Sequence, residues 1–87
     1  MEIVYSVKAA KQLKSIVRGD KKSAQMIIQG IESYSKNPSK RHDVKLLKGR
    51  FGLFKRLRIG SYRVLFDDKN RIMSIYEIKQ RQGAYND

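Results

Sequence analysis

The sequence contains no cysteine, a single histidine and a single proline, and only eight acidic residues among its 87. The absence of cysteine excludes disulfide bonds and thiolate metal sites, and it fits a reducing cytoplasm. With one histidine and no paired acids at ligand spacing, neither a metal nor another cofactor is expected. A Ser/His/Asp arrangement and a P-loop are also lacking, which excludes those two kinds of active site.

Long apolar runs are missing too. The opening residues, "MEIVYSVKAA", lack the basic start and the apolar stretch of a signal peptide. No segment approaches the roughly 20 apolar residues that a membrane-spanning helix needs. We therefore expect a cytoplasmic protein with no membrane partner. A chain of this length can form one domain, residues 1–87, around a single modest core.

Positive charge is in excess, because 20 Lys and Arg give a formal net charge of +12. Self-repulsion at this density opposes compaction, so the excess predicts a polyanionic partner. Nucleic acid is favoured over an acidic protein segment, and a membrane surface comes last. Between Lys40 and Arg63 there are nine basic residues and one acid, Asp43. A basic face that is merely solvated is the alternative interpretation.

The first half of the chain is expected to form a strand and two helices. Residues 2–7 alternate between apolar and polar, as in a short strand. Apolar residues then recur at three- and four-residue spacings over 8–18 and again over 21–36, which predicts two amphipathic helices. Asp20 is placed to cap the second helix, and Pro38 is expected to end the helical hairpin.

Three β segments are predicted after the helices, at residues 53–59, 62–67 and 72–79. The first two are joined by Gly60-Ser61, a two-residue connection with glycine first that is typical of a type II′ turn. The order β-α-α-β-β-β predicts a small α+β domain. Its curved antiparallel sheet should carry the two-helix hairpin on one face.

The basic hairpin is the stretch "FGLFKRLRIGSYRVLF", residues 51–66, in which apolar and basic residues alternate. If the residues that flank Gly60-Ser61 pair with each other, Lys55 lies on the mostly apolar side that faces the helices. Arg58 then lies directly opposite Arg63 on the other side. Like charges in this position destabilise a strand pair by roughly 0.2–1 kcal/mol, so the arrangement indicates an anionic ligand.

Together these segments resemble the RelE/ParE superfamily, the toxins of type II toxin–antitoxin pairs. The family pattern is Leu-x-Gly, an aromatic-basic strand, Arg-x-Gly-x-Tyr-Arg leading into an apolar strand, and Arg and Tyr after the last strand. The matching residues are Leu47-Lys48-Gly49, Arg58-Ile59-Gly60-Ser61-Tyr62-Arg63, Arg81 and Tyr85. The helical hairpin and the length agree as well, so the resemblance covers nearly the whole chain.

The RelE-like branch of the family cuts mRNA on the ribosome without a metal. The 2′-hydroxyl attacks the adjacent phosphate, a reaction that needs a base, an acid and cations around the developing charge. By resemblance, Arg63 would stabilise the phosphate, Arg56 and Arg81 would add positive charge, and Tyr85 would stack on a base or transfer a proton. The further residues expected to bind RNA are Lys45, Lys48, Arg50, Lys55, Arg58 and Lys79.

The sequence departs from the family pattern at the general base. Many nuclease members carry a histidine beside the C-terminal arginine, where this chain has Gln80. The only histidine, His42, precedes the predicted sheet and is interpreted as an exposed loop residue. Asp43 or Glu77 could act as the base, although each is more readily a charge partner of nearby basic residues. The base is therefore not identified.

Two other functions stay open. A ParE-like toxin of the same fold poisons DNA gyrase by binding and does not cut RNA. The combination of Arg63, Arg81 and Tyr85 favours the RelE-like nuclease. A catalytically inactive module that binds RNA or antitoxin is the third possibility, and Gln80 is its only hint. The implied partners are the ribosome, mRNA and a cognate antitoxin whose acidic segment covers the basic hairpin.

Overall fold

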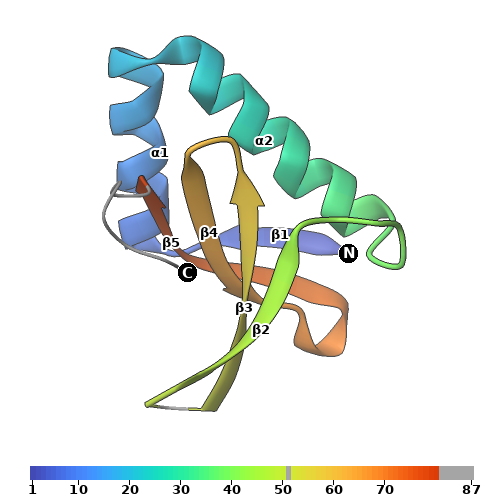
Figure 1. Ribbon diagram of the computed structural model, residues 1–87. Coiled ribbons are helices and arrows are strands. Elements are labelled where there is room, and N and C mark those ends of the chain that lie inside the picture. Colours follow the sequence, from blue (N-terminus) through green and yellow to red (C-terminus); the bar gives the residue numbers. More distant parts are fainter. Residues whose placement is uncertain (51, 81–87) are drawn as a thin grey trace.

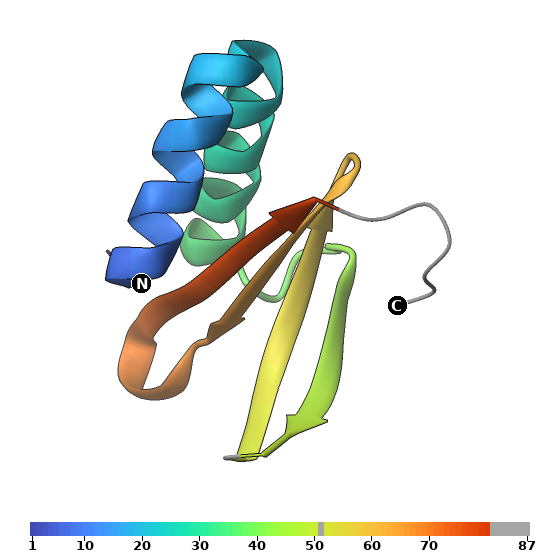
Figure 2. The same cartoon turned by 90° about the vertical axis from the view of Figure 1, so that its left-hand side faces the viewer.

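The computed structural model describes residues 1–50 and 52–80, which form two helices, five strands and one short 3-10 turn. Both helices lie on one face of the sheet and leave the other face without a helical cover (Figure 1; Figure 2). The predicted α+β class is confirmed. The elements are β1 (Glu2–Tyr5), α1 (Val7–Gly19), α2 (Lys21–Lys36), β2 (Val44–Gly49), β3 (Gly52–Ile59), β4 (Tyr62–Asp67), η1 (Lys69–Arg71) and β5 (Ile72–Gln80).

The sheet has the strand order β1-β5-β4-β3-β2. Strands β3, β4 and β5 pair antiparallel, as predicted. Strand β2 also pairs antiparallel with β3, whereas β1 pairs parallel with β5 instead of joining an antiparallel sheet. The strand β2 was not predicted. Its adjacent Leu46 and Leu47 interrupt the apolar–polar alternation that marks a strand, and Leu46 is 57% exposed. The mixed sheet therefore has one more strand than the predicted order.

Short polar side chains define where the helices begin. The Ser6 side chain accepts a hydrogen bond from the Ala9 amide at 3.0 Å and caps α1. The Asp20 carboxylate accepts one from the Ser23 amide at 3.1 Å, which confirms its predicted role at the start of α2. Hydrogen bonds from Ser23 lower the pKa of Asp20. The second helix ends at Lys36, before Pro38, as expected.

The core lies between α2, α1 and the helix-facing side of the sheet. Close approach of α2 to β3 depends on Gly30, because a Cβ there would lie 2.5 Å from Cδ1 of Ile59. Any larger residue at position 30 would push the helix off the sheet or displace Ile59. The buried apolar residues that form this core include Ala9, Ile27, Ile31, Tyr34, Leu57, Val64, Phe66, Met73, Ile75 and Ile78.

The hairpin of β3 and β4 has the predicted register. Ile59 pairs with Tyr62 across the turn, and Arg58 lies directly opposite Arg63. Gly60 has a φ angle of 58°, whereas Ser61 is not in the left-handed region, as a type II′ turn requires. The turn therefore determines which side chains share each face of the sheet.

A polar cluster on the helix-facing side joins α2 to the sheet. The Tyr34 hydroxyl donates to the Asp68 carboxylate at 2.7 Å, and the Lys55 ammonium lies 2.8 Å from the same oxygen. The hydrogen bond with Asp68 raises the pKa of Lys55. Burial raises the pKa of the Asp68 carboxyl, but the hydrogen bonds from Lys55 and Tyr34 outweigh this effect and lower it overall.

This cluster should make folding stability depend on acid pH. A carboxyl whose pKa is lowered by folding contributes stability above its unfolded pKa, about 3.9, and loses that contribution as pH falls through the folded value. The difference in unfolding free energy between wild type and Asp68→Asn should therefore be large at pH 7 and small at pH 2–3. Urea unfolding at both pH values measures it. Asp67→Asn is the matched control, and an Asp68→Asn difference that stays constant with pH would contradict the assignment.

The connection between β4 and β5 contains two consecutive residues in the left-handed region, of which Arg71 is the more strained. Asn70 and Arg71 both have left-handed backbone conformations, with φ angles of 57° and 61°. The left-handed region disfavours a residue with a Cβ by roughly 1–2 kcal/mol, and Asn tolerates it better than Arg. Arg71→Gly should raise the unfolding free energy by about 0.5–1 kcal/mol, because the glycine entropy cost offsets part of the relief. Thermal melts test this. Lys69→Gly, outside the left-handed region, should lower stability instead.

Candidate nucleic-acid interface

The face of the sheet that points away from the helices, here called the open face, carries basic side chains in two adjacent rows. One row crosses three strands, because Arg58 pairs with Arg63 and Arg63 pairs with Lys79. The second row contains Lys45 paired with Arg56. Consecutive rows on one face of a strand are about 7 Å apart. These five residues are called the cation rows.

The arginines of the cation rows are held close to the sheet surface. The Nε atoms of Arg56, Arg58 and Arg63 are shielded from solvent, and only 5% of the Arg56 side chain is exposed. A cation whose stem is already ordered loses little further entropy when an anion binds to it. The arrangement therefore resembles a preformed electrostatic site more than a set of loose surface charges.

Asp43 lies at one end of the rows and pairs with two arginines. Its carboxylate oxygens lie 3.3 Å from Arg56 Nη2 and 3.9 Å from Arg58 Nη1. Its backbone carbonyl accepts a hydrogen bond from the Arg58 amide at 2.9 Å. This acid offsets part of the repulsion between the rows and competes with any anionic ligand for the same guanidinium groups.

Glu77, the other acid considered as a general base, also lies in ion pairs. Its carboxylate is 3.1 Å from the Lys8 ammonium and 3.7 Å from the Lys79 ammonium, and 18% of its side chain is exposed. Both Asp43 and Glu77 are therefore placed as charge partners of basic neighbours. Neither has a geometry that singles it out as the base.

Several residues expected to bind RNA do not join the cation rows. Lys55 faces the helices and is bound to Tyr34 and Asp68. Lys48 pairs with Leu53 on that same side of the sheet, and Arg50 follows the end of β2. Their roles in RNA binding stay predictions, and the register separates Lys48 and Lys55 from the arginines.

The remaining predicted residues differ in how the structure places them. Arg81 and Tyr85 lie outside the described residues. Gln80 ends β5 and is exposed. His42 was expected to be an exposed loop residue but is only partly exposed, because its ring packs edge-on against Tyr34 at a centroid distance of 5.2 Å. This contact gives His42 a packing role beside the core.

Residues 1–50 and 52–80 contain neither a membrane-spanning helix nor a cluster of metal-ligating side chains. Neither of the two described helices is long and apolar enough to cross a membrane. The same residues contain no cluster of three or more His, Cys, Asp or Glu side chains that could hold a metal ion.

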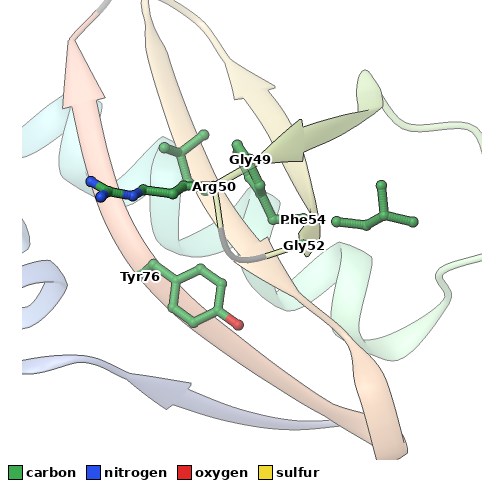
Figure 3. A pocket seen from close by; sticks show the side chains of 7 residues that line it. Gly49, Arg50, Gly52, Phe54 and Tyr76 are labelled. Carbon is green, nitrogen blue, oxygen red and sulfur yellow. The ribbon is translucent and has the colours of Figure 1, made fainter.

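A pocket of about 410 Å³ lies on the open face, where it is lined by Phe54, two residues before Arg56 on β3. Figure 3 shows the side chains that line it. It is lined by Leu53 and Phe54 from β3, Leu65 from β4, Tyr76 from β5, and Arg50 together with the glycines at positions 49 and 52. Tyr76 was not among the residues selected from the sequence. Tyr76 lies at a register shift of β5 that no sequence pattern marks.

No protein-family model and no curated protein matches the chain. Solved structures do match it. The YoeB dimer from Staphylococcus aureus is 20% identical with a TM-score of 0.78, over 94% of this chain and 98% of that chain. The archaeal RelE-RelB complex from Pyrococcus horikoshii OT3 is 24% identical with a TM-score of 0.74, over 95% and 97%. The YoeB/ParE toxin from Agrobacterium tumefaciens is 14% identical with a TM-score of 0.77, over 94% and 100%.

The chain therefore has the fold of the RelE, YoeB and ParE toxins over nearly its whole length. This confirms the fold that the sequence resemblance implied. Because a fold is shared among proteins with different activities, the function has to be argued from the residues on the open face.

Removing the acid beside the arginines should strengthen RNA binding. Asp43→Asn takes a competing negative charge from Arg56 and Arg58, so affinity for single-stranded RNA should rise several-fold at low salt and fall more steeply with added salt. Fluorescence anisotropy between 50 and 200 mM salt measures the affinity and its dependence on salt. Glu32→Gln removes the same charge from α2 and should change affinity less. Weaker binding by Asp43→Asn would mean that Asp43 supports the interface.

Proposed function

We propose that this chain is the toxin of a type II toxin–antitoxin system and that it arrests translation by cutting ribosome-bound mRNA. The observation that carries the proposal is the pair of cation rows, which lies on the helix-free face of a RelE-like fold. Arg63 is central in this arrangement, because it has Arg58 on one side and Lys79 on the other.

The proposed reaction is a transfer within the RNA backbone. The 2′-hydroxyl gives its proton to a base as its oxygen attacks the adjacent phosphorus. The bond to the 5′-oxygen breaks, and this oxygen takes a proton from an acid, so the products are a 2′,3′-cyclic phosphate and a 5′-hydroxyl. Negative charge builds on the phosphate oxygens during this step, and positioned cations stabilise it. Arg63 would supply the direct contact. The buried Arg56 would act through its positive potential, since little of its side chain is available for contact.

An antitoxin that covers the open face is the second part of the proposal. The structures of similar fold include a YoeB-YefM complex from Staphylococcus aureus and a RelE-RelB complex from Pyrococcus horikoshii OT3. An acidic segment of a cognate antitoxin would pair with the cation rows and block access of RNA to Arg63. A chain with a net charge of +12 offers strong electrostatic attraction to such a segment.

The experiment measures cleavage of a defined mRNA on programmed ribosomes by purified protein. Wild type should cut the mRNA within the decoding site, and Arg63→Ala should reduce the rate by on the order of 10²–10³. The unfolding free energy of Arg63→Ala should stay close to that of wild type, because the change removes a charge that faces Arg58 and Lys79. Arg18→Ala, which removes the same charge from the end of α1, is the matched control.

Other outcomes would point to other functions. Intact mRNA, together with DNA damage and filamentation on expression, would favour a gyrase poison. Binding of RNA without any cleavage would indicate an inactive binding module. Full activity of a well-folded Arg63→Ala protein would show that Arg63 does not stabilise the phosphate.

A further inference from the structure

Gly49, the last residue of the Leu47-Lys48-Gly49 motif, makes room for an aromatic ring on the open face. A Cβ at this position would lie 2.6 Å from Cε1 and 3.1 Å from Cδ1 of Phe54. The Phe54 ring therefore packs directly against the Gly49 backbone. Any side chain at position 49 would displace the ring, so the glycine determines where Phe54 sits.

Tyr76 reaches the same region because of a β-bulge. Leu65 pairs with Glu77 and Phe66 pairs with Ile75, which leaves Tyr76 as an extra residue in β5. Bulges re-aim side chains and are frequent beside functional sites. The Ser6 hydroxyl donates a hydrogen bond to the Tyr76 carbonyl at 2.8 Å, so the cap of α1 also holds the bulge. The Tyr76 residue is 43% exposed.

The pocket between these aromatic residues lies next to the cation rows. Phe54 is two residues before Arg56 on β3, and Leu65 is two residues after Arg63 on β4. Two residues along a strand span about 7 Å. A ligand with a planar apolar part in the pocket and a negative group about 7 Å away would contact the pocket and the cation rows at the same time.

We propose that the pocket formed by Phe54, Leu65 and Tyr76 binds an unpaired nucleobase of the RNA whose phosphate lies over the cation rows. This inference rests on the proposed function and adds a substrate subsite to it. Single-stranded RNA is recognised by stacking of unpaired bases on aromatic side chains, together with cations along the backbone. The pocket volume of about 410 Å³ lies in the range of small-ligand sites.

An antitoxin side chain is the competing occupant, and the lining of the pocket together with its charged surroundings favours RNA. Its lining combines two aromatic rings, two leucines (Leu53 and Leu65), glycine backbone and one basic residue, Arg50. A stack on aromatic rings matches the flat face of a base, and the neighbouring arginines match its phosphate. An aliphatic peptide side chain would use the apolar area but would neither stack on the rings nor pair with the neighbouring arginines.

The test measures binding to ribosomes whose decoding-site codon carries 2′-O-methyl riboses, which cannot be cut. Tyr76→Ala should weaken binding by about 5- to 150-fold, the usual contribution of one stacked base. Tyr76→Phe should bind like wild type, and Tyr76→Leu, which keeps apolar bulk but no ring, should bind weakly. Leu46→Ala removes an exposed apolar side chain from the other side of the sheet and should have no effect.

An abasic nucleotide placed in turn at each position of the codon identifies the stacked base. At one position the abasic nucleotide should weaken binding by the wild-type protein as much as Tyr76→Ala weakens binding to the intact codon. Combining the abasic nucleotide with Tyr76→Ala should then reduce affinity no further than either change alone. Losses that multiply at every position, or unchanged binding by well-folded Tyr76→Ala, would overturn the proposal. Weakened antitoxin binding with unchanged RNA binding would also overturn it, and would assign the pocket to the antitoxin.

These outcomes are separate from failure of the proposed function. If wild type does not cut ribosome-bound mRNA, the nuclease assignment fails. The same Tyr76 variants compared on free single-stranded RNA would still test the pocket, because stacking does not require cleavage. Equal affinity of wild type and Tyr76→Ala for that RNA would then reject the subsite.

Discussion

The pairing of β3 with β4 through the Gly60-Ser61 turn is the constraint on which the candidate site depends. Side chains on a strand alternate between faces, so a shift of one residue would move every arginine of the hairpin to the core side. The observed register places Arg58 opposite Arg63 on the open face and Leu57 opposite Val64 in the core. The same turn thus determines which residues of the hairpin enter the hydrophobic core and which form the cationic surface.

The two helices give the two faces of the sheet different roles. Because α1 and α2 cover one face, the apolar residues of β3, β4 and β5 are buried there, and the opposite face is left for charge (Figure 2). Ser6 links the two sides, since it caps α1 and also holds the β5 bulge that presents Tyr76. Packing on the helical side therefore positions a side chain on the functional side.

Much of the fold followed from local patterns. Helical periodicity, the cap at Asp20 and the stop at Pro38 placed both helices within a residue or two of their observed bounds. The strand β2 was missed because Leu46 and Leu47 are adjacent, and partners on β3, rather than alternation, hold it in the sheet. The parallel pairing of β1 with β5 joins the two ends of the described chain, which no local pattern can indicate.

The sequence by itself determined the excess of positive charge, the hairpin register and the identity of the arginines that share a face, because turn chemistry and strand alternation are local properties. Only the tertiary structure decided that Arg56 is buried beside Asp43 and that Lys55 binds Asp68. It also decided that the β5 bulge brings Tyr76 to the pocket beside Phe54. These relations depend on contacts between residues far apart in the chain. Such contacts result from packing and strand pairing, which cannot be inferred from the spacing of residues along the sequence.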